Sequence, residues 1–169
     1  MKNKVVLITG SAKGIGKAIA KELAKNGYDI VINYLHSKQE ALSLQKELIA
    51  LYGVNVLAMQ ADVSSVEQVD AMVNEIEDKM GGVDVLVNNA AIDLSNLFHL
   101  KTSEEFQKTM NVNVVGAFNC AKRVSHHMME KEYGRIINIS STNGMNTYYP
   151  MSIDYDVSKA ALNALTHDL

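Results

Sequence analysis

The sequence is poor in cysteine and proline, with one residue of each, and it contains no long apolar run. The single cysteine, Cys120, excludes an internal disulfide framework and fits the reducing conditions of the cytoplasm. No apolar segment approaches the length of a membrane-spanning helix, and the apolar run near the N-terminus is too short for a signal peptide. We therefore expect a cytoplasmic protein with no membrane partner.

The sequence also lacks a marked excess of charge of either sign, because its formal net charge is −3. Such a balance gives no sign of a nucleic-acid-binding or membrane-surface protein. The five histidines and Cys120 show no metal-ligand spacing, and we expect His126 and His127 to lie on a solvated helix face. Neither a nucleic acid nor a metal is an expected ligand.

Apolar segments alternate with amphipathic ones along the whole chain. The predicted strands are residues 4–9, 29–34, 54–62, 83–90 and 134–140. The predicted helices are residues 14–27, 37–53, 64–82, 102 to about 129, and a last one from about 155. Strands that are apolar throughout indicate a parallel sheet covered on both faces. With right-handed crossovers, this predicts one domain over 1–169, a three-layer α/β/α Rossmann-type doubly wound sheet of about five strands.

Local signals predict how some of the helices begin and pack. An apolar stripe on the first helix is expected from Ile15, Ile19 and Leu23. Ser37 and Glu40 have the spacing of a capping box at the start of the second helix, and a serine and a glutamate repeat that spacing at the start of the third.

Three glycines, Gly10, Gly14 and Gly16, stand between the first strand and the first helix. Glycines at such a place permit a tight turn and close approach to a pyrophosphate, which the positive end of the helix dipole attracts. A P-loop is excluded, because its first glycine would fall on Ser11 and its magnesium-binding serine or threonine on Ala18. The turn therefore predicts a dinucleotide site, although such a turn can also serve only to connect strand and helix.

Later motifs strengthen the dinucleotide interpretation. After "TGSAKGIG" come "NNAA" at 88–91, "NVVGAF" at 113–118, "NISS" at 138–141 and "YDVSK" at 155–159. Together they resemble the short-chain dehydrogenase/reductase family over essentially the whole chain. Within it, the chain is most similar to 3-oxoacyl-acyl-carrier-protein reductases of fatty acid biosynthesis. Members of the family continue beyond the point that corresponds to Leu169, so we expect the C-terminal part of the family fold to be missing.

The resemblance implies a catalytic set of Asn113, Ser141, Tyr155 and Lys159. Tyr155 and Lys159 are four residues apart and would share one side of a helix. In this set Tyr155 is the general acid, while Lys159 tunes it and holds the nicotinamide ribose. Ser141, with Ser140 as the alternative, would bind the carbonyl oxygen, and Asn113 would complete a proton relay. Met145, Tyr148, Tyr149 and Met151 would line the substrate side.

The expected cofactor is NADP(H). An NAD-binding chain would carry a carboxylate at the end of the second strand, where this chain has Tyr34, and Lys13 can pair with a 2′-phosphate. The resemblance implies that Asp62 brackets the adenine with Val63, and the alternative is that Asp62 acts only as a cap near the third helix. The expected cofactor-binding residues are Gly10, Ser11, Lys13, Gly14, Ile15, Gly16, Tyr34, Asp62, Val63, Asn89, Ala90, Tyr155 and Lys159.

The function expected from the resemblance is reduction of a ketone carbonyl by NADPH. The substrate would be a 3-oxoacyl thioester, carried by acyl carrier protein, or a similar small carbonyl compound. Two alternatives remain: an NAD(P)-dependent alcohol or sugar dehydrogenase, and a truncated dinucleotide-binding module without activity. Family members usually form homotetramers or homodimers.

Overall fold

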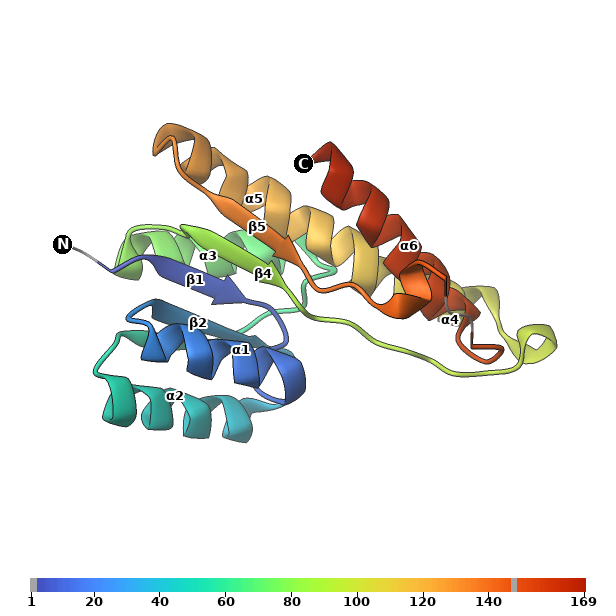
Figure 1. Ribbon diagram of the computed structural model, residues 1–169, viewed down its shortest axis with the longest axis horizontal. Helices are drawn as coiled ribbons and strands as arrows, with labels where there is room; N and C mark the ends of the chain where they lie inside the picture. The colour runs from blue at the N-terminus through green and yellow to red at the C-terminus, as the bar shows by residue number, and fades with distance from the viewer. Residues whose placement is uncertain (1–2, 147–148) are drawn as a thin grey trace.

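Five parallel strands form a single sheet in the order β3-β2-β1-β4-β5 (Figure 1). The computed structural model describes residues 3–146 and 149–169. The strands are β1 Val5–Ile8, β2 Asp29–Tyr34, β3 Val56–Gln60, β4 Val85–Asn88 and β5 Arg135–Asn138. The order confirms the predicted doubly wound sheet. It reverses between β1 and β4, and this is the place where open α/β sheets bind ligands.

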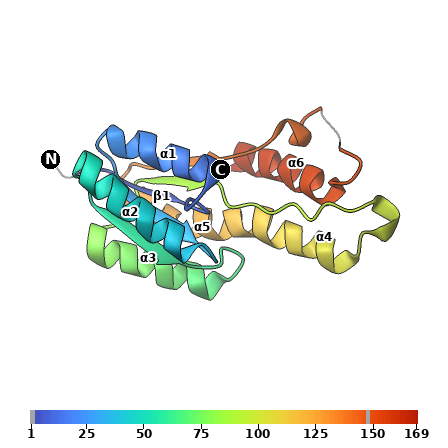
Figure 2. The same ribbon diagram turned by 90° about the horizontal axis from the view of Figure 1, so that it is seen from below.

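Helices cover both faces of the sheet and give the predicted three layers (Figures 1 and 2). The helices α1 Gly14–Lys25 and α2 Lys38–Tyr52 pack on one face, and α3 Val66–Met80 and α5 Gly116–Glu130 pack on the other. The remaining helices are α4 Ser103–Met110 and α6 Ile153–Asp168. No helix among the described residues is long and apolar enough to cross a membrane.

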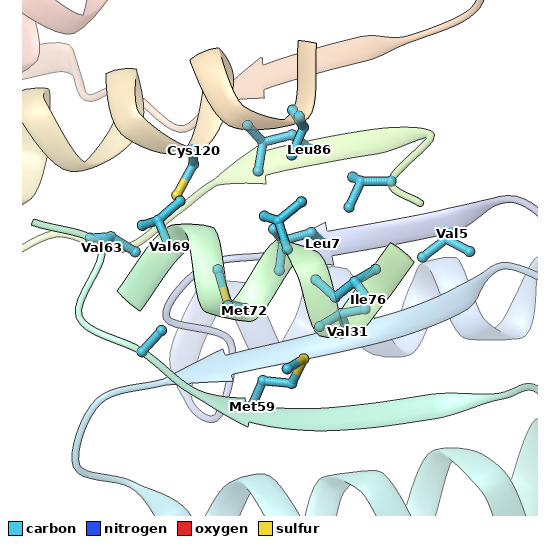
Figure 3. Close-up of a cluster of buried hydrophobic side chains, with 14 of the residues drawn as sticks. Val5, Leu7, Val31, Met59, Val63, Val69, Met72, Ile76, Leu86 and Cys120 are labelled. Atoms are coloured by element: carbon cyan, nitrogen blue, oxygen red, sulfur yellow. The ribbon is translucent and has the colours of Figure 1, made fainter. Parts of the chain in front are cut away.

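Alternate residues of the central strands supply two separate cores, and for this reason these strands are apolar throughout. Leu7, Val31 and Leu86 pack with Cys120 and the apolar side of α3 (Figure 3). Ile8 and its neighbours on β2 pack against α1 and α2 on the other face. Burial raises the pKa of the Cys120 thiol to about 12, so this cysteine acts as an apolar core residue.

Packing departs from the predicted helix signals at several points. Ile19 and Leu23 of the predicted stripe are partly buried and pack against the core, whereas Ile15 is 65% exposed. The fully buried residues of α1 are Gly16, Ala20 and Ala24. These residues are small, so the backbone of α1 can approach the sheet closely. The expectation of a solvated pair of histidines is also only half right, because the Nε2 atom of His127 is buried.

The predicted capping boxes are wrong. The Ser37 side chain makes no capping hydrogen bond, and the Glu40 carboxylate pairs with Lys13 instead. At α3 the N-cap is Ser65, whose hydroxyl oxygen accepts a hydrogen bond from the Gln68 amide. A complete capping box occurs where none was predicted, at Thr102 and Glu105 before α4.

The long helix predicted over 102–129 is interrupted by a π-helical turn, Asn111–Val115, between α4 and α5. Asn113, a weak helix former, lies at the centre of this turn and is buried. Single π-helical turns inside α-helices are frequent at functional sites.

A buried ion pair fastens α6 to α4 and to the segment that precedes α4. The Asp154 carboxylate is fully buried, accepts a hydrogen bond from Thr109 Oγ1 at 2.6 Å and lies 3.0 Å from Lys101 Nζ. The same ammonium donates to the carbonyl of Leu94. Burial alone would raise the pKa of Asp154, but the hydrogen bonds from Thr109 and Lys101 outweigh it and hold that pKa below its ordinary value.

The lowered pKa of Asp154 predicts a loss of stability in acid. A carboxylate whose pKa is lower in the folded state stabilises the fold above its unfolded pKa, about 3.9, and this contribution disappears as the pH falls through the folded pKa. Replacing Asp154 with Asn leaves Lys101 buried without a counter-charge. We expect Asp154→Asn to lower the free energy of unfolding near neutral pH by about 3 kcal/mol and to flatten its dependence on acid pH. Urea unfolding at neutral and acid pH measures both effects.

Asp78→Asn on α3 is the matched control, because Asp78 is exposed and loses the same charge. It should shift the free energy of unfolding by less than about 0.5 kcal/mol. A stable Asp154→Asn variant with the pH profile of the unaltered chain would contradict the assigned role of this ion pair.

Candidate active site

A cavity of about 960 Å³ opens at the carboxyl ends of the central strands, where the strand order reverses. Its walls come from the turn after β1, the ends of β2 and β3, the loop after β4 and one side of α4. Among the residues that line it are Gly10, Lys13, Tyr34, Asp62, Val63, Asn89 and Ala90, all expected from the sequence to contact a cofactor.

The turn between β1 and α1 requires glycine for two different reasons. Gly10 has a positive φ of 62°, and a Cβ atom there would lie 3.0 Å from the Cα atom of Ala90. A Cβ atom on Gly16 would come within 2.6 Å of Asn89 Nδ2. Both close approaches involve the loop after β4, so the glycines allow this loop to pack directly on the turn.

Hydrogen bonds lock the same two segments together. Asn89 Nδ2 donates to the carbonyls of Thr9 and Gly10, at 2.9 and 3.2 Å. In return, Thr9 Oγ1 accepts hydrogen bonds from the amides of Asn89 and Ala90, at 2.9 and 3.0 Å. Asn89, expected from the sequence to bind the cofactor, therefore also braces the glycine turn.

Two polar residues that support the turn were not singled out from the sequence. Asn33 is buried on β2, where its Oδ1 accepts from the Gly10 amide at 3.1 Å and its Nδ2 donates to the Ala61 carbonyl at 3.0 Å. Thr9 is equally buried. The available signal was a polar residue within or directly after an otherwise apolar strand, because such a residue needs a buried partner.

The first turn of α1 can receive an anion. Its N-cap, Lys13, makes no capping hydrogen bond through its side chain, so the amides of the first turn are not capped by that side chain. Gly14 and Ile15 in this turn are exposed. An uncapped helix N-terminus beside a cavity fits the pyrophosphate of a dinucleotide, and the present residues therefore fit NAD(P). Ser11, in contrast, is fully buried and donates to the Ile8 carbonyl, so it shapes the turn and does not reach the cavity.

The residues expected to contact adenosine lie along the wall formed by Lys13 and the ends of β2 and β3. Tyr34 ends β2 and is only 6% exposed, and no carboxylate occupies its position. Lys13 Nζ lies 2.7 Å from Glu40 Oε1 on α2. Asp62 Oδ1 accepts hydrogen bonds from the amide and hydroxyl of Ser64, and Asp62 lines the cavity. Asp62 is not the cap of the third helix, because the N-cap of α3 is Ser65.

Tyr155 and Lys159 lie one helical turn apart on α6. Lys159 is 3% exposed, its ammonium donates to the Ile139 carbonyl at 2.6 Å, and it lies 5.5 Å from the centre of the Tyr155 ring. Burial lowers the pKa of Lys159. Because the Ile139 amide bonds to the carbonyl of Asn88, this pair lies beside the carboxyl ends of β4 and β5.

The two serines considered for the carbonyl-binding role have different partners. Ser140 Oγ is engaged with α6, since it lies 3.5 Å from the carbonyl of Lys159. Ser141 Oγ accepts a hydrogen bond from the amide of Asn143 at 3.2 Å, which leaves its own proton for another acceptor. The geometry thus favours Ser141 as the donor. Met145 and Tyr149, from the expected substrate-side loop, are exposed, whereas Tyr148 lies outside the described residues.

Asn113 connects the cavity to α6. Its Oδ1 accepts from the Ile92 amide at 2.8 Å, and its Nδ2 donates to the Ile92 carbonyl and to Ser158 Oγ, both at 2.9 Å. Ile92 lines the cavity, and Ser158 precedes Lys159. Both donor positions of the Asn113 side-chain amide are therefore used in this brace, and among the described residues no hydrogen bond joins it to Lys159. Ser158, the partner of this brace, was not anticipated from the sequence.

Comparison with known proteins gives consistent matches. A 3-oxoacyl-[acyl-carrier-protein] reductase of Staphylococcus aureus is 37% identical over 163 residues, which are 96% of this chain and 65% of that protein. A gluconate 5-dehydrogenase from Burkholderia cenocepacia, solved with NADP and tartrate, superposes with a TM-score of 0.90 at 33% identity, covering 99% of this chain and 65% of the other. An NAD⁺-bound xylitol dehydrogenase gives a TM-score of 0.92 at 32% identity, with 99% and 64% covered.

The chain thus spans about 65% of the length of the curated relatives that it matches. The family model described as short chain dehydrogenase matches residues 4–169, nearly the whole chain. This match agrees with the sheet order, the glycine turn and the tyrosine–lysine pair on α6. The chain therefore belongs to the short chain dehydrogenase family.

Proposed function

We propose that this chain carries the cofactor-binding and proton-transferring parts of an NADPH-dependent carbonyl reductase. The strongest support is the buried ammonium of Lys159, 5.5 Å from the Tyr155 ring beside the carboxyl ends of the central strands. This position places the ammonium beside the phenol that would donate the proton, as the proposed roles of the pair require. The proposal includes a single NAD(P)-binding domain over 1–169 and a cytoplasmic location.

Each proposed catalytic residue has a separate task. Tyr155 donates a proton to the oxygen of the ketone, and Lys159 stabilises the phenolate that remains. Ser141 donates a hydrogen bond to the same oxygen, where negative charge develops during reduction. When bound, NADPH supplies the hydride. Asn113 acts by holding the Ile92 segment and α6 in place, through the hydrogen bonds to Ile92 and Ser158.

The preference for NADPH rests on charge at the adenosine end of the cavity. The end of β2 offers Tyr34 and no carboxylate to accept hydrogen bonds from a 2′-hydroxyl. Lys13, on the cavity wall, supplies a cation for a 2′-phosphate.

The proposed substrate is a 3-oxoacyl thioester, presented by acyl carrier protein, or a similar small carbonyl compound, and the proposed assembly is a homotetramer or homodimer. The relatives named 3-oxoacyl-[acyl-carrier-protein] reductase support this choice. The solved gluconate and xylitol dehydrogenases favour a second candidate, oxidation of a sugar or polyol by the same site. Comparing turnover of an acetoacetyl thioester with turnover of polyols distinguishes the two.

The role of Tyr155 is tested by removing one hydroxyl. With NADPH and an acetoacetyl thioester, Tyr155→Phe should lower kcat by at least about 100-fold, because the substitution removes the proposed proton donor. The affinity for NADPH, measured by calorimetry, should change by less than about twofold. Tyr52→Phe, at the end of α2, is the control and should keep full activity. Substantial turnover by Tyr155→Phe would rule out its role as the acid.

The role of Lys13 is tested by nucleotide binding alone. Lys13→Ala should weaken NADPH binding about tenfold, the scale of one lost charge-assisted hydrogen bond, and should leave NADH binding nearly unchanged. Lys21→Ala is the matched control, since Lys21 lies on the same helix and pairs with Glu47 on α2. Equal effects of Lys13→Ala on the two nucleotides would remove the basis for assigning NADPH.

A further inference from the structure

Two ion pairs join the neighbouring helices α1 and α2. Lys13 Nζ lies 2.7 Å from Glu40 Oε1, and Lys21 Nζ lies 2.5 Å from Glu47 Oε1. The first pair reaches the cavity through Lys13, which is part of its wall, whereas neither Lys21 nor Glu47 lines it. Glu40 stands in the first turn of α2, just after Ser37, which also lines the cavity.

The ionised state of Glu40 is favoured by its surroundings. The hydrogen bond from Lys13 lowers the pKa of the Glu40 carboxyl, and a hydrogen bond that its own backbone amide donates to the carboxylate acts in the same direction. Glu40 is therefore a carboxylate at neutral pH, and it already pairs with Lys13, the cation proposed to receive a 2′-phosphate.

From this arrangement we infer that Glu40 is a specificity-determining residue that opposes NADPH: its carboxylate competes with the 2′-phosphate for Lys13. A 2′-phosphate that binds Lys13 would lie near the Glu40 carboxylate. The two groups are both negatively charged and repel each other. A 2′-hydroxyl carries no charge, so NADH does not incur this cost. The inference rests on the proposed function, because it assumes that the adenosine end of a nicotinamide dinucleotide lies in this cavity.

A carboxylate beside Lys13 can also have the opposite effect. An ion pair restricts the lysine side chain, and a lysine that is already oriented loses less entropy on binding a phosphate. In that case, removal of Glu40 would weaken NADPH binding. We expect repulsion to prevail, because the Lys13 and Glu40 side chains are 61% and 46% exposed and an ion pair so open to water restrains its lysine only weakly.

The test is calorimetric titration of the chain and of Glu40→Gln with NADPH and with NADH. Glutamine keeps the size of the side chain and removes its charge. We expect Glu40→Gln to bind NADPH about three- to fivefold more tightly, with NADH affinity changed by less than about twofold. The difference should shrink in about 1 M salt, which screens exposed charges. Glu47→Gln is the matched control, because it removes the same charge from the same helix and breaks the other ion pair.

A second pair of probes isolates the 2′-phosphate. Adenosine 2′,5′-bisphosphate and adenosine 5′-monophosphate differ by that group and contain no nicotinamide. Glu40→Gln should bind the bisphosphate more tightly and the monophosphate as before. In a Lys13→Ala background the gain in affinity should be smaller, because the Glu40 carboxylate and the 2′-phosphate then no longer compete for Lys13.

The outcomes separate this inference from the proposed function. If neither NADPH nor NADH binds the unaltered chain, the proposed function fails and the inference fails with it. If both nucleotides bind and Glu40→Gln leaves their affinity ratio unchanged, only the inference fails. A weaker NADPH complex of Glu40→Gln would also overturn it and would make Glu40 an organiser of Lys13. An equal gain in Glu47→Gln would mean that net charge, and not the position of Glu40, determines the ratio.

Discussion

The close approach of the turn after β1 to the loop after β4 is the constraint on which the candidate site depends. Gly10 and Gly16 allow the approach, because a side chain at either position would meet Ala90 or Asn89. Thr9 and Asn89 then fix it with four hydrogen bonds between the two segments. The cavity wall, the orientation of α1 and the position of the segment leading to Ile92 all follow from this contact. Gly10 and Gly16 thus allow two protein segments to pack together beside the N-terminus of α1.

A second set of polar contacts fixes the position of α6. Asn113 links the Ile92 backbone to Ser158, and the buried pair of Lys101 and Asp154 ties the N-terminal end of α6 to α4. Buried polar groups are costly unless they are satisfied, so such contacts permit few alternative arrangements. The residues flanking Tyr155 and Lys159 on α6 are therefore fixed by the same segments that border the cavity.

The strands and the order of elements could be predicted from the sequence, because a short apolar run such as "VVLI", bounded by glycines and amphipathic segments, is typical of a buried strand. Helix starts were predicted poorly. Ser37 and Glu40 have the spacing of a capping box, yet Glu40 pairs with Lys13, which is distant in sequence. The local spacing of residues cannot predict such a partner. The supporting roles of Asn33 and Ser158 were missed for the same reason, since each depends on a contact between segments far apart in the chain. The cofactor and catalytic roles of the candidate residues remain predictions.

The π-helical turn at Asn111–Val115 sets the relative phase of α4 and α5. Each residue of an α-helix turns the chain by about 100°, so the extra residue of a π turn rotates everything before it relative to everything after it. Deleting one residue here would convert the π turn into an ordinary α-helical turn, so that α4 and α5 would form one continuous helix. It would also swing Thr109 away from Asp154 while α5 kept its place in the core. In this region a change of chain length by one residue is therefore a more severe alteration than most substitutions, and the spacing between Thr109 and Cys120 is expected to tolerate neither insertion nor deletion.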